Sequence, residues 1–220
     1  MPYQHRWYND TTIDWPVGKV VCVGRNYVAH ARELNNPVPS QPLLFMKPAT
    51  SVVALDAPLL LPSGTGPVHY ETELAILIGK PLTRANGTQA KEAIAGVGLA
   101  LDLTLRDLQT QLKADGHPWE RAKAFDGACP LSSFVPVSDF GDIAGAGFSL
   151  TIDGELRQKG NTADMITPVL PLIIHISETF TLRPGDVVLT GTPAGVGALE
   201  SGQKLLLSLD GGLEVETSVQ

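Results

Sequence analysis

The stretch from Val68 to Lys80, V-H-Y-E-T-E-L-A-I-L-I-G-K, decides how the rest of the sequence is interpreted. Its second half, from Leu74 to Ile78, is apolar and ends at a glycine, as expected for a buried strand. Side chains alternate across a strand, so Glu71 and Glu73 lie on one face of it, about 7 Å apart along the backbone. Two like charges at this spacing repel, and burial favours protonation of at least one of them. A bound cation would remove this cost, and so would a solvated sheet edge.

The composition predicts one globular domain of mostly β structure. The chain has 220 residues, of which 43% are hydrophobic and 18% are charged, and it is rich in glycine (22) and proline (17). Such a composition favours many short strands and tight loops over a helix bundle. We therefore expect a mostly β (α+β) fold with a few flanking helices, in a single domain over residues 1–220. Residues 1–18 are expected to pack on this domain as an N-terminal extension.

Charge and hydropathy argue against two classes of partner. The formal net charge is −7 with no compensating basic block, which disfavours nucleic acid as a partner. No apolar run is long enough to span a bilayer, and residues 1–10 do not resemble a signal peptide. The two cysteines, Cys22 and Cys129, form no C-x-x-C pair and are expected to be buried free thiols. We therefore expect a cytoplasmic protein that contacts no membrane.

The coarse pattern of elements alternates strands with a few helices. We expect strands at 19–24, 43–47, 97–103 and 186–190, helices at 26–34, 104–116 and 165–178, and hairpin turns at 153–154 and 210–211. Asn26 is expected to cap the first helix through its side chain. Thr104 and Asp107 match a capping box at the start of the second helix.

A third acid, Asp102, interrupts the apolar strand L-A-L-D-L-T-L. A buried carboxylate there needs a partner, and one alternative is the set of free N–H groups at the start of the following helix. Together with Glu71 and Glu73, it forms a set of three hard oxygen ligands, which suits Mg²⁺ or Mn²⁺ better than zinc. Three such ligands leave about three octahedral positions for water or a chelating substrate.

His30 and Glu33 lie three residues apart in H-A-R-E, so both side chains face the same side of the predicted helix. A carboxylate beside an imidazole fixes the tautomer of the ring and makes the ring more basic. Such an imidazole can act as a general base that takes a proton from water. The alternative is an ordinary surface helix with an incidental contact between these two side chains.

Several further polar residues are candidates for substrate contacts. The loop G-T-P-A-G-V-G at 191–197 offers the backbone N–H groups at Gly191 and the hydroxyl of Thr192 to an anion, although a plain turn explains it equally well. Lys47 ends an apolar strand and is expected to extend outward, and Lys123 lies in A-K-A-F-D-G.

Arg106 and Gln109 follow Asp102 by four and seven residues and lie on one helix face. They could therefore contact a substrate that is bound to the metal.

Five motifs together resemble the fumarylacetoacetate hydrolase family. They are G-R-N-Y-x-x-H-x-x-E, H-Y-E-x-E-L-A-x-x-I-G-K, A-L-D-L-T-x-R-D-x-Q, A-K-x-F-D-x-x-C-P and L-x-G-T-P-x-G-V-G, and they occur in order from about residue 20 to the C-terminus. The chain is most similar to the small, single-domain acylpyruvase branch. The resemblance implies a mixed β-roll or sandwich with flanking helices and a homodimer.

The same resemblance implies roles for individual residues. Glu71, Glu73 and Asp102 would hold Mg²⁺ or Mn²⁺, and His30 with Glu33 would activate water. The remaining implied contacts are Lys123 polarising the substrate, Gln109 supporting an oxyanion and Thr192 meeting the substrate carboxylate, with Arg25, Asn26, Lys47, Arg106 and Gly191 completing the substrate site.

The expected chemistry is metal-dependent action on 2-oxo and 2,4-dioxo acids. The main expectation is hydrolytic C–C cleavage of acylpyruvates, such as fumarylpyruvate or acetylpyruvate, to pyruvate and a carboxylic acid. The alternatives are keto–enol tautomerisation or decarboxylation of oxaloacetate, and isomerisation of a 2-hydroxyhepta-2,4-diene-1,7-dioate type of substrate. A non-catalytic module that binds a metal or dicarboxylate would not need His30 and Glu33, which counts against it.

Overall fold

The computed structural model describes residues 3–220, so residues 1 and 2 of the expected N-terminal extension lie outside the described residues. The strands are β1 (Val20–Gly24), β2 (Leu43–Lys47), β3 (Val52–Ala54), β4 (Val68–Tyr70), β5 (Thr72–Ile78), β6 (Ile94–Leu101), β7 (Thr104–Leu105), β8 (Cys129–Leu131), β9 (Val135–Pro136), β10 (Gly147–Ile152), β11 (Glu155–Asn161), β12 (Val187–Leu189), β13 (Gly197–Ala198), β14 (Lys204–Leu209) and β15 (Leu213–Ser218).

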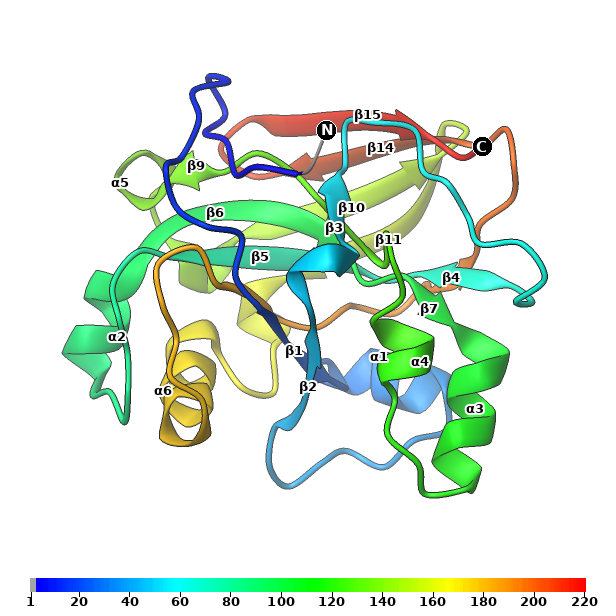
Figure 1. Cartoon of the computed structure of the whole chain (residues 1–220), viewed down its shortest axis with the longest axis horizontal. Helices are drawn as coiled ribbons and strands as arrows, with labels where there is room; N and C mark the ends of the chain where they lie inside the picture. The colour runs from blue at the N-terminus through cyan, green and yellow to red at the C-terminus, as the bar shows by residue number, and fades with distance from the viewer. Residues whose placement is uncertain (1–2) are drawn as a thin grey trace.

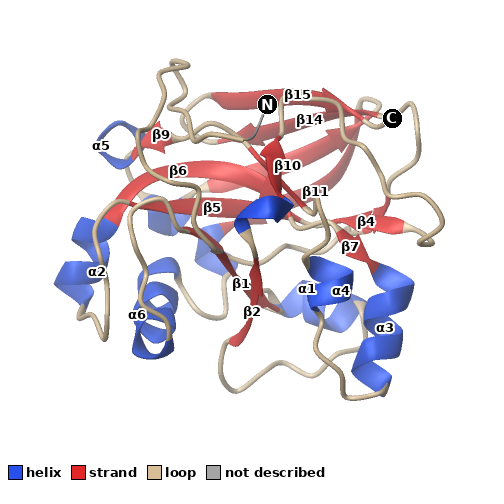
Figure 2. Ribbon diagram, viewed as in Figure 1, coloured by secondary structure: helices blue, strands red, loops and turns tan. Residues whose placement is uncertain are grey.

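The helices are fewer and short. They are α1 (Val28–Glu33), α2 (Gly87–Ala93), α3 (Arg106–Ala114), α4 (Glu120–Lys123), α5 (Val137–Phe140) and α6 (Val169–Thr179), with 3₁₀ turns η1 (Ala49–Ser51), η2 (Ile143–Gly145) and η3 (Thr162–Asp164). Strands form the upper layers of the view in Figure 2, and most helices lie along the opposite side. The expectation of a mostly β fold with a few flanking helices is confirmed.

The largest sheet has the strand order β2-β1-β12-β5-β6-β8-β3, with β9 paired to β6. The long curved pair β5 and β6 crosses the middle of the molecule (Figure 1). Alternation along β5 follows the sequence pattern: Leu74 and Ile76 enter one apolar core, and Ala75 and Leu77 enter a second core on the other face. Both faces of this sheet are therefore buried, which explains why β5 is apolar throughout its second half.

A second sheet, β11-β10-β14-β15, packs over one face of the first (Figure 1). Inward side chains of β10 and β14, such as Leu150 and Leu207, share a core with Leu74 and Ile76 of β5. Both predicted hairpins are present, because β10 pairs with β11 and β14 pairs with β15 in antiparallel register. A third small sheet, β13-β4-β7, brings the end of the glycine-rich loop next to the start of the acidic stretch.

Two predicted helix caps are wrong. The first helix begins at Val28, and neither Tyr27 nor Asn26 caps it through a side chain. Thr104 lies in β7, and its hydroxyl donates to the carbonyl of Asp102 (3.0 Å) instead of capping α3. At the first helix the amide of Asn26 bonds to the backbone carbonyls of Thr167 and Thr190 instead, and at the second the backbone of Thr104 pairs with β4.

The third predicted helix also starts later than expected. α6 begins at Val169, directly after Pro168, and its other proline, Pro171, lies in the first turn, where no intrahelical N–H bond is lost.

The N-terminal segment and the cysteines both contribute to the second core. Ile13 is 4% exposed there, and Trp7 and Trp15 pack against the same cluster. Cys22 and Cys129 are buried free thiols in this core, as expected. Within the described part of the chain, no helix combines the length and apolar character needed to cross a membrane.

Candidate active site

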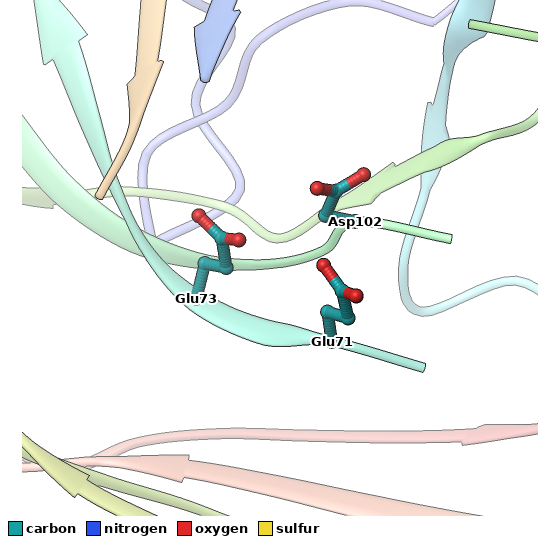
Figure 3. Close-up of side chains that lie close together, drawn as sticks. All are labelled: Glu71, Glu73 and Asp102. Carbon is teal, nitrogen blue, oxygen red and sulfur yellow. The ribbon is translucent and has the colours of Figure 1, made fainter. Parts of the chain in front are cut away.

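Glu71, Glu73 and Asp102 converge at the end of the β5–β6 pair (Figure 3). Glu71 precedes β5, Glu73 lies within it, and Asp102 follows β6. The register is fixed by the bond from the backbone N–H of Asp102 to the carbonyl of Glu71 (2.8 Å). One carboxylate oxygen from each residue lies within 4.8 Å of the other two, and all three side chains are buried. The predicted set of three carboxylates is therefore assembled.

Two cations hold Glu71 in its ionised form. Nζ of Lys123 donates to Oε2 of Glu71 and to Oδ2 of Asp102, both at 2.7 Å, and the guanidinium of Arg106 donates to Oε1 of Glu71. Burial alone would raise the pKa of Glu71, but these cations hold it well below its ordinary value. Burial would likewise lower the pKa of Lys123, yet the two carboxylates raise it, so the ammonium form persists.

Lys47 is buried beneath the acids rather than directed outward, so that expectation is wrong. Its Nζ donates to the carbonyls of Ala128 (2.9 Å), Lys123 and Leu103, and lies 2.8 Å from Oδ1 of Asp102. Its side chain has no exposed surface, and it does not line the cavity described below. Lys47 therefore stabilises the backbone around Asp102 without lining the cavity, which argues against the direct substrate contact expected from the sequence.

Glu73 is the acid without a cation partner among the described residues. Its Oε2 accepts a bond from the N–H of Gly191 (2.6 Å). Burial and the neighbouring carboxylates of Asp102 and Glu71 raise its pKa well above the ordinary value. The repulsion expected between closely spaced acids is therefore present, and it acts by raising the pKa of Glu73.

A divalent cation fits this arrangement on two observations. Oδ1 of Asp102 is buried and lies 2.8 Å from the ammonium of Lys47, but the donors of Lys47 are directed to backbone carbonyls and none is aligned to hydrogen-bond with this oxygen. Burial and the carboxylates of Asp102 and Glu71 raise the pKa of Glu73, and a bound cation would offset this crowding of negative charge. The acidic set could hold a metal ion through oxygens of the type that Mg²⁺ and Mn²⁺ prefer.

Metal binding should release a proton, because an ion binds only the carboxylate form of Glu73. Apparent affinity should therefore rise as pH rises toward the raised pKa of Glu73, and fall as acid protonates this residue. Titration calorimetry in buffers of different ionisation enthalpy measures the number of protons released. Binding that releases no proton from mildly acidic to neutral pH contradicts a raised pKa of Glu73.

The predicted pair of His30 and Glu33 forms on α1. Nδ1 of His30 lies 3.2 Å from Oε2 of Glu33. The other oxygen of this carboxylate accepts from the N–H of Gly195 (2.9 Å), so the glycine-rich loop orients Glu33, which in turn orients the ring. The imidazole is buried and lines the cavity, with Nε2 as the ring nitrogen not engaged by Glu33.

Gln158, on β11, was not singled out from the sequence although it connects the parts of the site. Its Oε1 accepts from the N–H of Thr72 (2.9 Å), and its Nε2 donates to Oγ1 of Thr192 (2.9 Å) and to the carbonyl of Pro193 (3.0 Å). The side chain is 1% exposed. It thus ties the strand that carries Glu73 to the loop that contacts both Glu73 and Glu33.

Replacing Gln158 by Met should lower the free energy of unfolding by about 2–3 kcal/mol, because the buried N–H of Thr72 loses its acceptor without a substitute. Chemical denaturation measures this loss. Gln111→Met is the control, since Gln111 is exposed on α3 and should change stability by less than about 0.5 kcal/mol. Equal stabilities of the two variants would contradict the role assigned to Gln158.

One cavity gathers most of the predicted side chains. It is lined by Val23, Gly24, Arg25, His30, Leu34, Asn36, Phe45, Glu71, Glu73, Arg106, Gln109, Lys113, Trp119, Lys123 and Thr192. Gln109 is 7% exposed, and its Oε1 accepts from Arg106 (2.7 Å), which leaves the amide NH₂ as a donor. Lys113, Asn36, Phe45 and Trp119 were not singled out from the sequence, because nothing in their local patterns marks a site.

Asn26 does not line this cavity and was predicted wrongly as a helix cap. Its amide nitrogen donates to the carbonyls of Thr167 (3.0 Å) and Thr190 (2.8 Å), and its amide oxygen accepts from the N–H of Thr167 (2.8 Å). With these bonds the amide connects two backbone segments, which argues against a direct substrate contact. Gly191 contributes its N–H to Glu73, and its φ of +95° places its α-carbon against Asn26, where a side chain would clash.

Known proteins resemble this chain over nearly its whole length. Residues 19–220 match the model of the fumarylacetoacetate (FAA) hydrolase C-terminal family. Oxaloacetate tautomerase YcgM of Escherichia coli (strain K12) is 53% identical over 95% of this chain and 96% of its own. A solved structure from Yersinia pestis CO92 is 53% identical, with a TM-score of 0.97 over 99% of this chain and 100% of its own.

A third relative was solved with ligands. Fumarylpyruvate hydrolase from Pseudomonas aeruginosa, in complex with Mn²⁺ and pyruvate, is 42% identical with a TM-score of 0.92, covering 99% of this chain and 95% of its own. The family expected from the five motifs is therefore confirmed by sequence and by fold. The chain belongs to the fumarylacetoacetate hydrolase family.

Proposed function

We propose that this protein is a Mg²⁺- or Mn²⁺-dependent oxaloacetate keto–enol tautomerase. The observation that supports this most strongly is the 53% identity to an oxaloacetate tautomerase over 95% of the chain. The expected main activity, hydrolysis of acylpyruvates, is not confirmed, and the relatives support the tautomerase alternative better. The cavity suits the proposed substrate, because acids for a divalent ion lie beside the cations Lys123, Arg106, Lys113 and Arg25.

In this proposal Glu71, Glu73 and Asp102 hold the ion, and the cavity residues handle the substrate. When bound, the ion supplies Lewis-acid stabilisation of negative charge on the 2-oxo oxygen. The reaction moves one proton between C3 and that oxygen and consumes no water. His30 exchanges the proton at C3 through Nε2, while Glu33 fixes its tautomer by binding Nδ1. The ammonium of Lys123 and the amide of Gln109 stabilise the oxygen as it gains charge.

Acylpyruvate cleavage is the second candidate, supported by the 42% identity to fumarylpyruvate hydrolase. The same residues would serve it if His30 took a proton from water, which then attacks C4 and breaks the C3–C4 bond. Decarboxylation of oxaloacetate and isomerisation of an unsaturated 2-oxo diacid draw on the same enolate stabilisation. A cytoplasmic homodimer remains our expectation for the state in which the enzyme acts.

The test compares both reactions on one preparation loaded with Mg²⁺. Enol absorbance follows oxaloacetate tautomerisation above the spontaneous rate, and pyruvate release follows cleavage of acetylpyruvate and fumarylpyruvate. We expect rapid tautomerisation and slow cleavage. Rapid pyruvate release together with tautomerisation at only the spontaneous rate would overturn the proposal in favour of the hydrolase.

A further inference from the structure

Two cations that line the cavity have no acidic partner among the described residues. Arg25, directly after β1, makes no ion pair there, and Nζ of Lys113 on α3 donates to Oδ1 of Asn36 (3.0 Å) rather than to a carboxylate. In contrast, Arg106 and Lys123 are paired with the acidic set. Arg106 and Lys123 are therefore matched by carboxylates, whereas the wall of the cavity formed by Arg25 and Lys113 carries two unmatched positive charges.

The backbone at Arg25 is unusual for the residue it carries. Its φ of +60° lies in the left-handed region, which is unfavourable for an L-residue with a side chain. Such conformations concentrate at binding sites, where the surrounding structure holds them. Here the result is a half-buried guanidinium facing the cavity without an acidic partner.

Crowding of like charge at this wall is a second sign of an anion-binding site. Burial lowers the pKa of Lys113, and Arg25 and Arg106 lower it further, so these three cations lie close enough to repel. The aromatic rings of Phe45 and Trp119, whose centroids are 6.0 Å apart, cover part of the same cavity and reduce solvent screening. An anion bound between Arg25 and Lys113 would relieve the repulsion.

We propose that Arg25 and Lys113, together with the amide NH₂ of Asn36, form a subsite for a second carboxylate of the ligand. This inference rests on the proposed function in taking the first carboxylate and the 2-oxo group to lie toward the acidic set. The subsite makes the cavity select dicarboxylates over monocarboxylates of the same chain length. It also explains why oxaloacetate, with two carboxylates, suits this protein.

The test uses two stable four-carbon acids, malate and 2-hydroxybutyrate, which share a skeleton and differ in the second carboxylate. Titration calorimetry with Mg²⁺-loaded protein gives both dissociation constants without turnover. Charge-assisted hydrogen bonds of this kind should make malate bind about 10- to 100-fold more tightly than 2-hydroxybutyrate. The ratio should shrink as ionic strength rises, since part of the wall is open to solvent.

Lys113→Met and Arg25→Met remove one charge each while keeping most of the side-chain volume. Each should bring the ratio of the two dissociation constants down by about tenfold, and Lys113→Glu should reverse the preference. Lys80→Met is the matched control, because Lys80 is exposed and pairs with Glu92 away from the cavity. Thermal unfolding verifies that each variant is folded.

The outcomes separate this inference from the proposed function. A wild-type protein that tautomerises oxaloacetate but binds both acids equally overturns the subsite alone. A wild-type protein that prefers malate, and loses this preference in the variants but not in Lys80→Met, supports the subsite even if oxaloacetate is not turned over. A preference that survives both Met substitutions places the second carboxylate elsewhere and overturns the assignment.

Discussion

Replacing Glu73 by Gln is expected to abolish Mg²⁺-dependent turnover while the protein stays folded. The amide oxygen of Gln can still accept the hydrogen bond that the N–H of Gly191 donates (2.6 Å). Because burial and nearby carboxylates raise the pKa of Glu73, a neutral amide of the same shape should be tolerated at this position. The substitution removes only the ability to become an anionic ligand. Metal affinity should fall by more than about 100-fold, beyond the 10–100-fold that outer-shell changes typically cost.

Glu73 is a better choice for this test than Asp102. Lys47 and Lys123 both lie against Asp102, so its removal would leave buried ammonium groups without a counter-charge and threaten folding itself. Asp107→Asn provides the matched control, since Asp107 is an exposed acid in the first turn of α3. Metal affinity is measured by calorimetry and folding by thermal unfolding. Full activity of the wild-type protein after chelator treatment would contradict a metal-dependent mechanism altogether.

The acidic set could be predicted from sequence because strand alternation is a strictly local rule. Once Leu74 to Ile78 is read as a buried strand, the side on which Glu71 and Glu73 lie follows from parity. The structure bears this out, with Ala75 and Leu77 on the side of the second core and Leu74 on the other. Spacing of three residues on a helix predicted the contact of His30 with Glu33 for the same reason.

Residues whose partners come from distant segments could not be predicted in this way. Lys47 has the local signature of a strand end with a lysine directed to solvent, but the carbonyls that bind its Nζ belong to residues 103–128. Gln158 lies in the polar-looking stretch E-L-R-Q-K-G-N, and its burial results from the packing of β11 against the loop at 191–197. Asn26 is of a residue type that often caps helices, yet its amide donates to the backbone carbonyl of Thr167, which is 141 residues away in the sequence.

The cationic wall is a further case of a feature set by tertiary structure. Arg25 and Lys113 are 88 positions apart in the sequence. Lys113 looks like an ordinary surface residue there, and Arg25 was placed at the substrate site only by the resemblance to the family. They face one cavity because β1 and α3 converge beside the acidic set. The local sequence pattern could predict the acidic residues that would hold the metal, because they lie on two adjacent strands. The end that would select among substrates depends on how loops and helices close over those strands.

His30→Ala should reduce cleavage of acylpyruvates more than it reduces tautomerisation of oxaloacetate. Cleavage needs the imidazole to take a proton from water and then to support departure of the enolate, and losing a general base typically costs about 100- to 10,000-fold. Tautomerisation needs only the exchange at C3, with much of the enolate charge stabilised by the bound ion. We therefore expect a loss near the lower end of this range for tautomerisation and near the upper end for cleavage.

Glu33→Gln tests the same pair through orientation rather than removal. An amide at this position can turn its NH₂ toward Nδ1 of His30 or toward the N–H of Gly195, and either choice disturbs one of the two bonds that the carboxylate accepts. The loss should approach that of His30→Ala and should shift the pH–rate profile, which a purely structural role would not do.

The chain supplies its own control for both variants of this pair. His175 and Glu178 have the same spacing on α6, with Nδ1 and Oε2 3.5 Å apart, but His175 is only half-buried, Glu178 is exposed, and neither lines the cavity. His175→Ala and Glu178→Gln should therefore leave both reactions unchanged. Initial rates of enol loss and pyruvate release, measured on all four variants, decide the matter. Equal losses in the two reactions would assign His30 one shared proton transfer, and no loss in either would remove the pair from the mechanism.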